Sequence, residues 1–176
     1  MIKPDWEEIG KNEIEQFEKM TELQKYQYFL MLQYNSPYGW GEENPESSDC
    51  SGGVCLALTA ATGILIRTTA DELFKKYFTK DTPSQSTIRA AFWITMVEKN
   101  HGGSIVPPGT AVHIAGIVGN GACLSAEDNG SVVRSIDSLS LPECRVLIRG
   151  LDRDKLRSGL VTYGIDANFW RYFKNE

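Results

Sequence analysis

The two halves of the chain differ in the spacing of their apolar residues. Over residues 5–20, apolar positions recur every three to four residues, which predicts an amphipathic helix with a break near Gly10. Residues 50–62 are almost wholly apolar and predict a buried helix, capped by Ser48 or Asp49 and ended by a glycine. Two capping boxes predict further helices, Thr21 with Gln24 for residues 21–34 and Thr69 with Glu72 for residues 70–77.

The second half of the chain has short apolar runs separated by Gly and Asn. The segments GNG (119–121) and DNG (128–130) are hairpin signals, so we expect the strands beside them to pair antiparallel. Helices followed by antiparallel strands indicate an α+β domain. A final helical turn is predicted within residues 163–173. The predicted strands cover residues 88–98, 110–119, 122–128, 131–136 and 144–150.

Composition narrows the class of protein. A chain of 176 residues with 41% hydrophobic and 23% charged residues is typical of one globular domain with a sizeable core. The net charge of -5 argues against a nucleic-acid partner. No apolar run approaches the roughly 18 residues of a membrane helix, and the acidic N-terminus lacks the apolar segment of a secretory signal. We therefore expect synthesis in the cytoplasm without a Sec signal, and no membrane insertion.

The cysteines and histidines are few. No CxxC pair is present and the chain has only two histidines, so neither a structural zinc site nor another metal or organic cofactor is expected. The chain is also too long to look like a small disulfide scaffold. Cys55, Cys123 and Cys144 fall in apolar helix or strand patterns, and we expect them to be structural.

Cys50 has a different setting, because it stands at the predicted first turn of an apolar helix. The free N–H groups and partial positive charge of a helix N-terminus stabilise a thiolate, which is the reactive form of cysteine. A thiolate nucleophile needs a base, and only His101 and His113 can supply an imidazole. His101 lies in a predicted turn. His113 shares a strand face with Ala115 and Ile117, and the residues alone leave open whether it is a core histidine or a base.

Three motifs together carry a resemblance to a known family. YGWG (38–41) and DCSGG (49–53) are followed about sixty residues later by HIAGIVGNG (113–121). In this order they resemble the NlpC/P60 family of papain-like cysteine peptidases, over about residues 28–133. The resemblance implies an α+β papain-like fold, in which N-terminal helices and the helix of the nucleophile pack on a central antiparallel sheet.

The resemblance also implies roles for single residues. Cys50 would be the nucleophile, His113 the base, and Tyr38 a group that helps to hold the oxyanion. The family places a polar residue twelve positions after the histidine, here Ser125, to orient the imidazole. Serine is short for this role, and Glu127 has the same strand parity and would replace it if the register slipped by two residues. The substrate-binding residues would be Asp49, Ser51, Trp40 and Glu127.

The activity implied by the resemblance is that of a thiol protease in cell wall degradation. It is hydrolysis of the peptide stems of bacterial peptidoglycan, commonly at a D-γ-glutamyl bond to diaminopimelate or lysine. This activity would suit a monomeric phage-type lysin, a component of a phage tail or secretion assembly, or an enzyme of cytoplasmic wall recycling. Residues 1–20 would be a helical extension and residues 21–176 the catalytic domain. The alternatives are a CHAP-like amidase, an acyltransferase or deamidase, and a catalytically weak wall-binding or structural module on the same fold.

Overall fold

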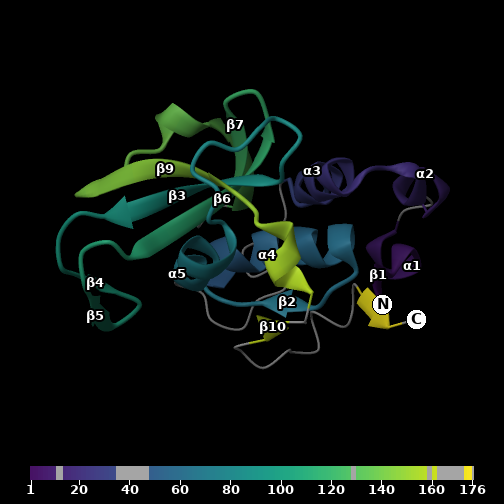
Figure 1. The fold of residues 1–176 in the computed structure, drawn as a ribbon, viewed down its shortest axis with the longest axis horizontal. Helices are drawn as coiled ribbons and strands as arrows, with labels where there is room; N and C mark the ends of the chain where they lie inside the picture. Colours follow the sequence, from purple (N-terminus) through teal and green to yellow (C-terminus); the bar gives the residue numbers. More distant parts are fainter. Residues whose placement is uncertain (11–13, 35–47, 128–129, 158–159, 162–172, 176) are drawn as a thin grey trace.

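N-terminal helices pack on a central five-stranded antiparallel sheet, so the predicted α+β class is confirmed (Figure 1). The computed structural model describes residues 1–10, 14–34, 48–127, 130–157, 160–161 and 173–175, without the side chains of Ser48 and Asp49. The helices are α1 (Trp6–Ile9), α2 (Ile14–Lys19), α3 (Glu22–Leu32), α4 (Ser48–Thr62) and α5 (Ala70–Glu72), followed by the π-helical turn η1 (Leu73–Tyr77) and the 3-10 turns η2 (Ile136–Ser138) and η3 (Arg153–Leu156).

All five predicted strands are present and form the central sheet. Its order is β8 (Gly130–Ser135), β7 (Ala122–Glu127), β6 (Ala111–Gly119), β3 (Arg89–Thr95) and β9 (Cys144–Gly150), with every neighbouring pair antiparallel. Sequence periodicity missed the shorter pairs, which are β1 (Ile2–Pro4) with β11 (Phe173–Asn175), β2 (Ile66–Arg67) with β10 (Leu160–Val161), and β4 (Lys99–His101) with β5 (Ser104–Val106).

The predicted helices are present, with changes at their ends. Gly10 adopts a left-handed conformation (φ 77°) at the end of α1, which explains the break between α1 and α2. The capping box of Thr21 and Gln24 opens α3 as predicted. The cap predicted at Ser48 or Asp49 is wrong, since α4 begins at Ser48 and both residues are inside its first turn. Polar residues are tolerated there, and an acid is favoured by the helix dipole.

The two ends of the chain lie side by side. Strand β1 pairs with β11, and the register joins Ile2 to Asn175 and Pro4 to Phe173. The helical turn predicted within 163–173 falls outside the described residues except for Phe173, which is in β11. None of the helices in the described ranges is long and apolar enough to cross a membrane.

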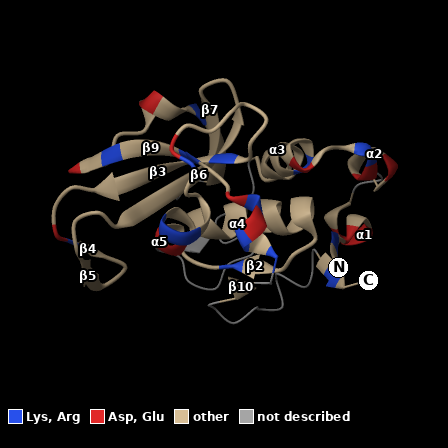
Figure 2. Ribbon diagram, viewed as in Figure 1, with Lys and Arg blue, Asp and Glu red and all other residues tan. Residues whose placement is uncertain are grey.

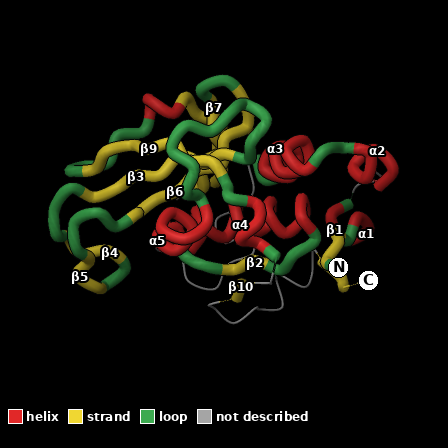
Figure 3. The backbone as a smooth tube through the Cα atoms, in the orientation of Figure 1, coloured by secondary structure: helices red, strands yellow, loops and turns green. Residues whose placement is uncertain are grey.

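The central sheet separates two layers of the molecule. Helices α3, α4 and α5 all contact β6 and cover one face of the sheet, and Figure 3 shows these helices grouped on that side. Phe92, Ile114 and Leu124 point toward them and join the main core. The alternate residues Trp93 and Ala115 point to the other face, in a second cluster that includes Ile136 of η2 and the partly buried leucines after it. The middle strand β6 contains no Lys, Arg, Asp or Glu and is drawn in tan in Figure 2.

Two glycines allow the helices to lie this close to the sheet and to one another. A Cβ at Gly116 would meet Leu30 Cδ1 at 2.4 Å and the Tyr26 hydroxyl at 2.9 Å, so α3 contacts β6 across a bare backbone. A Cβ at Gly53 would meet Gln33 Oε1 at 2.6 Å. The buried Gln33 amide donates to Gly53 O at 2.9 Å, which ties the end of α3 to the N-terminal half of α4. This contact helps to fix the turn that carries Cys50.

The glycine contact between α3 and β6 is testable with a pair of variants on one strand. We expect Gly116→Ala to lower the free energy of unfolding by about 1–3 kcal/mol, because buried side chains must shift to admit the methyl group. Gly119→Ala is the matched control, since its Cβ would have nothing within 4 Å. Urea unfolding checks both variants. Equal losses in the two would contradict the close-packing explanation.

Candidate active site

Cys50 lies in the first turn of α4, as the sequence predicted. Its side chain is 8% exposed and belongs to the core cluster on the helix side of the sheet. The next residue, Ser51, is fully buried. Tyr38 and Trp40 lie outside the described residues, and of Asp49 only the backbone is described. The described part of this end of the candidate site therefore consists of the thiol, its buried neighbour Ser51 and the helix N-terminus.

The structure brings His113 and Ser125 together. His113 Nε2 lies 2.9 Å from Ser125 Oγ, and Ser125 is fully buried. Gly116 of β6 is paired with Leu124 of β7, so Ser125, the next residue of β7, points to the face opposite to that of Leu124, which is the face of His113. The ring of Trp93, directly opposite His113 on β3, meets the imidazole edge-on with centroids 5.0 Å apart. Ser125 thus engages Nε2 of the imidazole, and the contact with the Trp93 indole fixes the orientation of the imidazole ring.

A register shift lies next to His113 on β6. Trp93 of β3 is paired with His113, but the next residue, Ile94, is paired with Ala111, so that Val112 is an extra residue. His113 keeps the regular alternation of the strand and lies on the face of Trp93. The extra residue reverses the alternation beyond this point, so that Ala111 packs with Ile94 in the core on the helix side.

Cys50 and His113 consequently pack in different surroundings. The thiol is in the cluster between α4 and the sheet, whereas the imidazole meets the ring of Trp93, a member of the second cluster, edge-on. Within the described residues, the hydrogen bond and the ring contact of His113 are with Ser125 and Trp93, and neither reaches Cys50. The predicted partners of His113 on β7 are therefore assembled, and the thiol–imidazole contact is not among the described ones.

Glu127 and Arg134 extend the His113–Ser125 pair along the same face. Arg134 Nη2 donates to Glu127 Oε1 at 2.8 Å, and Arg134 Nε donates to Glu127 Oε2, so the contact is bidentate. The hydrogen bond from Arg134, the hydroxyl of Ser125 and the charge of Arg134 lower the pKa of Glu127 against the opposing effect of its partial burial. Glu127 is thus an ionised carboxylate beside Ser125, and it does not replace Ser125 as the partner of the imidazole.

The environment of His113 keeps its imidazole neutral. Desolvation lowers its pKa to about 4, and the charges of Arg134 and His101 act in the same direction, while Glu127 opposes them. A neutral imidazole has a lone pair free to accept a proton, as a general base must. The low pKa also means that the imidazolium is unfavourable in this resting arrangement.

The other three cysteines have structural surroundings, as predicted. The Cys55 thiol, fully buried in α4, donates to Thr68 O at 3.7 Å. Burial raises the pKa of Cys123 to about 11 and also raises that of Cys144. All four cysteines of the chain are thiols, with no disulfide between them in the described structure. Because raised pKa values disfavour thiolates, Cys123 and Cys144 are poor nucleophiles.

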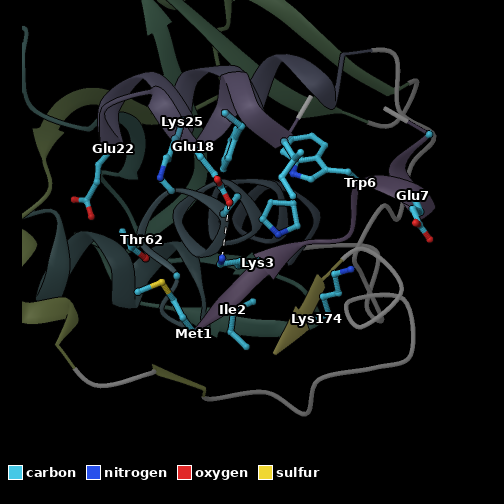
Figure 4. A pocket seen from close by; sticks show the side chains of 17 residues that line it. Met1, Ile2, Lys3, Trp6, Glu7, Glu18, Glu22, Lys25, Thr62 and Lys174 are labelled. Atoms are coloured by element: carbon cyan, nitrogen blue, oxygen red, sulfur yellow. Dashed lines mark ion pairs between the residues drawn. The ribbon is translucent and has the colours of Figure 1, made fainter. Parts of the chain in front are cut away.

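A cavity of about 760 Å³ lies at the opposite end of α4 (Figure 4). Its apolar wall includes Trp6 and Phe17, and the ion pair of Lys3 with Glu18, at 3.8 Å, crosses it. The last residues of α4, 60–62, and Gly63 after them line one side of the cavity. None of the described residues lining this cavity belongs to the predicted site.

Sequence reasoning missed Arg134 and Trp93. The signal for Arg134 is the hairpin: the register Glu127 to Gly130 places Arg134 opposite Cys123 and on the same face as Glu127. An opposite-charge pair on that face is a recognised stabilising arrangement. The contact of Trp93 with His113 depends on the register between β3 and β6, which cannot be predicted from a local sequence pattern.

No protein-family model and no curated protein sequence matches the chain. The functional argument therefore rests on the motifs and on the geometry described above.

The low pKa of His113 makes a prediction about stability. The imidazole has a pKa of about 4 in the folded chain against 6.5 when unfolded, so acidification between these values favours the unfolded state. We expect the wild type to lose up to about 2 kcal/mol more than His113→Gln between pH 7 and pH 5. Urea unfolding of both proteins at the two pH values gives this difference. Equal losses of unfolding free energy in the two proteins would show that burial does not lower the pKa of His113.

Proposed function

We propose that this protein is a cysteine peptidase on a papain-like, NlpC/P60-like scaffold, which hydrolyses peptide stems of bacterial peptidoglycan. The observation that carries the proposal is the 2.9 Å contact between His113 Nε2 and Ser125 Oγ. Ser125 stands at the position where the resembled family has its orienting residue. A catalytic base needs one ring nitrogen fixed so that the other can act, and the contact with Ser125 supplies this.

In the proposed reaction, the two ring nitrogens of His113 and the thiol of Cys50 would have separate roles. Ser125 engages Nε2, so Nδ1 would take the thiol proton and the thiolate would attack the scissile carbonyl carbon. The N-terminal N–H groups of α4 and Tyr38 would stabilise the oxyanion. The imidazolium would then protonate the leaving amine, and water would hydrolyse the acyl-enzyme. A D-γ-glutamyl bond to diaminopimelate or lysine is the target we favour.

This mechanism sets a geometric requirement. Cys50 packs on the helix side of the sheet and His113 on the other side, so the reacting arrangement must bring Nδ1 to the sulfur. Because Ser125 engages Nε2 on the face of Trp93, the thiol must reach Nδ1 while the contact between Ser125 and the imidazole is kept.

The same observation favours a second candidate, a non-catalytic module that binds wall peptides. In that case, the placement of Cys50 and His113 in separate clusters is the permanent arrangement. The thiol would then be a buried core group, and the His113–Ser125 pair would be a satisfied polar pair within the sheet. Both candidates predict contact with peptide stems, and only the enzyme predicts cleavage.

Muropeptides of defined stem composition separate the two candidates. We expect the wild type to release stem fragments, seen by mass spectrometry, and Cys50→Ala and His113→Ala each to lower the rate by at least about a hundredfold. Cys55→Ala is the matched control, because it removes a buried thiol one helical turn away and should leave cleavage intact if the protein remains folded.

The possible outcomes point in different directions. Cleavage that survives Cys50→Ala would overturn the nucleophile assignment. Binding of stems without cleavage of any of them would favour the non-catalytic module. Alkylation at pH 6 gives an independent check, since a thiol activated by the helix N-terminus should react faster than a peptide cysteine.

A further inference from the structure

We propose that Asp71 is a positioning residue, which holds the start of β6 against α5 and thereby sets where His113 lies relative to the first turn of α4. The inference deepens the proposed function and rests on it for its catalytic consequence. Its structural part stands on hydrogen bonds that connect the segment 66–72, which runs from β2 through α5, to α4 on one side and to β6 on the other.

The segment 66–72 follows α4 toward the N-terminus of that helix. Ile66 N donates to Thr59 Oγ1 at 3.2 Å, and the Thr59 hydroxyl donates to Ile66 O at 3.4 Å. One helical turn nearer the N-terminus of α4, the Cys55 thiol donates to Thr68 O at 3.7 Å. The segment thus brings α5 toward the first turns of α4, and the two helices are in contact (Figure 3).

Asp71 makes the connection from α5 to β6. Its Oδ1 accepts from Ala111 N at 2.9 Å, and its Oδ2 accepts from Lys75 Nζ at 3.0 Å. Ala111 is the first residue of β6 and is buried, so an N–H group without an acceptor would be unfavourable there. The carboxylate of Asp71 supplies this acceptor from a different element of the fold.

The hydrogen bond of Asp71 lies beside the bulge that precedes His113. Ala111 and His113 stand on either side of Val112, the extra residue of β6. A bulge interrupts the ladder of hydrogen bonds and bends the strand, so the path of the chain there depends on its other contacts. Asp71 fixes the chain immediately before the bulge, and His113 follows immediately after it. The position of the His113 backbone therefore depends on this contact.

The two connections join the elements that carry the proposed nucleophile and base. Cys50 is in the first turn of α4 and His113 is on β6, and the segment 66–72 binds both elements. The proposed reaction requires the sulfur to reach Nδ1 while Ser125 keeps its contact with Nε2. A displacement of about 1 Å is enough to lower such a rate strongly. Asp71 thus contributes to the reaction without touching the substrate or the reacting atoms.

Three variants separate the hydrogen bond of Asp71 from its ion pair. Asp71→Ala removes both, Asp71→Asn keeps an acceptor oxygen for Ala111 N, and Lys75→Ala removes the ion pair alone. We expect Asp71→Ala to lower kcat about ten- to a hundredfold with KM changed less than about twofold, and Asp71→Asn to recover most of this loss. Lys75→Ala is the matched control and should keep wild-type kcat.

NMR of the full-length protein labelled with 15N gives a readout that needs no substrate. In Asp71→Ala we expect the Ala111 amide to exchange at least about tenfold faster and the His113 ring signals to shift, because the chain beside the bulge is released. Both observables should stay close to wild type in Asp71→Asn and Lys75→Ala. The amide of Phe92, within the sheet, should keep its protection in every variant, which shows that the fold is intact.

The outcomes separate this inference from the proposed function. Wild-type kcat in Asp71→Ala would overturn the inference, as would unchanged exchange at Ala111 or an Asp71→Asn variant as impaired as Asp71→Ala. Faster exchange at Ala111 and shifted His113 signals, both restored in Asp71→Asn, would support the positioning role even if no stem peptide is cleaved by the wild type. In that last case the proposed peptidase fails while the role of Asp71 in placing His113 stands.

Discussion

The register between β3 and β6 is the constraint on which the site depends. The extra residue Val112 interrupts the alternation of side chains, so Ala111 faces the helices while His113 faces Trp93. One inserted residue is enough, because the side-chain period of a strand is two. The pairing of His113 with Trp93 places the imidazole on the Ser125 side of the sheet, and the bulge beside it lets Ala111 pack with the helices.

The helix side of the sheet is organised by close contacts that leave little freedom. Gly116 admits α3 onto β6, and Gly53 admits the Gln33 amide onto α4. Because packed interiors respond to a single added methyl group, these contacts hold the first turn of α4, and with it Cys50, in a defined place. The opposite face carries two polar contacts beside its apolar cluster, Arg134 with Glu127 and Ser125 with His113.

Local patterns were sufficient for most of the fold. Capping at Thr21 marked the start of α3, the apolar run after Cys50 marked α4, and alternation marked all five strands of the sheet. The pairs β1–β11, β2–β10 and β4–β5 were missed, because strands of two or three residues contain no measurable period. Ser125 was proposed as the partner of His113 from the position at which the resembled family has its orienting residue, whereas Arg134 and Trp93 enter through cross-strand registers.

The sequence by itself determined the helices, the strands, the antiparallel class and the candidates for chemistry, because each of these depends on spacing within a short segment. The family resemblance pointed to Ser125 as the partner of His113. Only the tertiary structure decided that Glu127 is held by Arg134, and that His113 and Cys50 pack on different sides of the sheet. These features depend on the register between strands and on the packing of helices on the sheet, and a shift of one residue in a register moves a side chain to the other face.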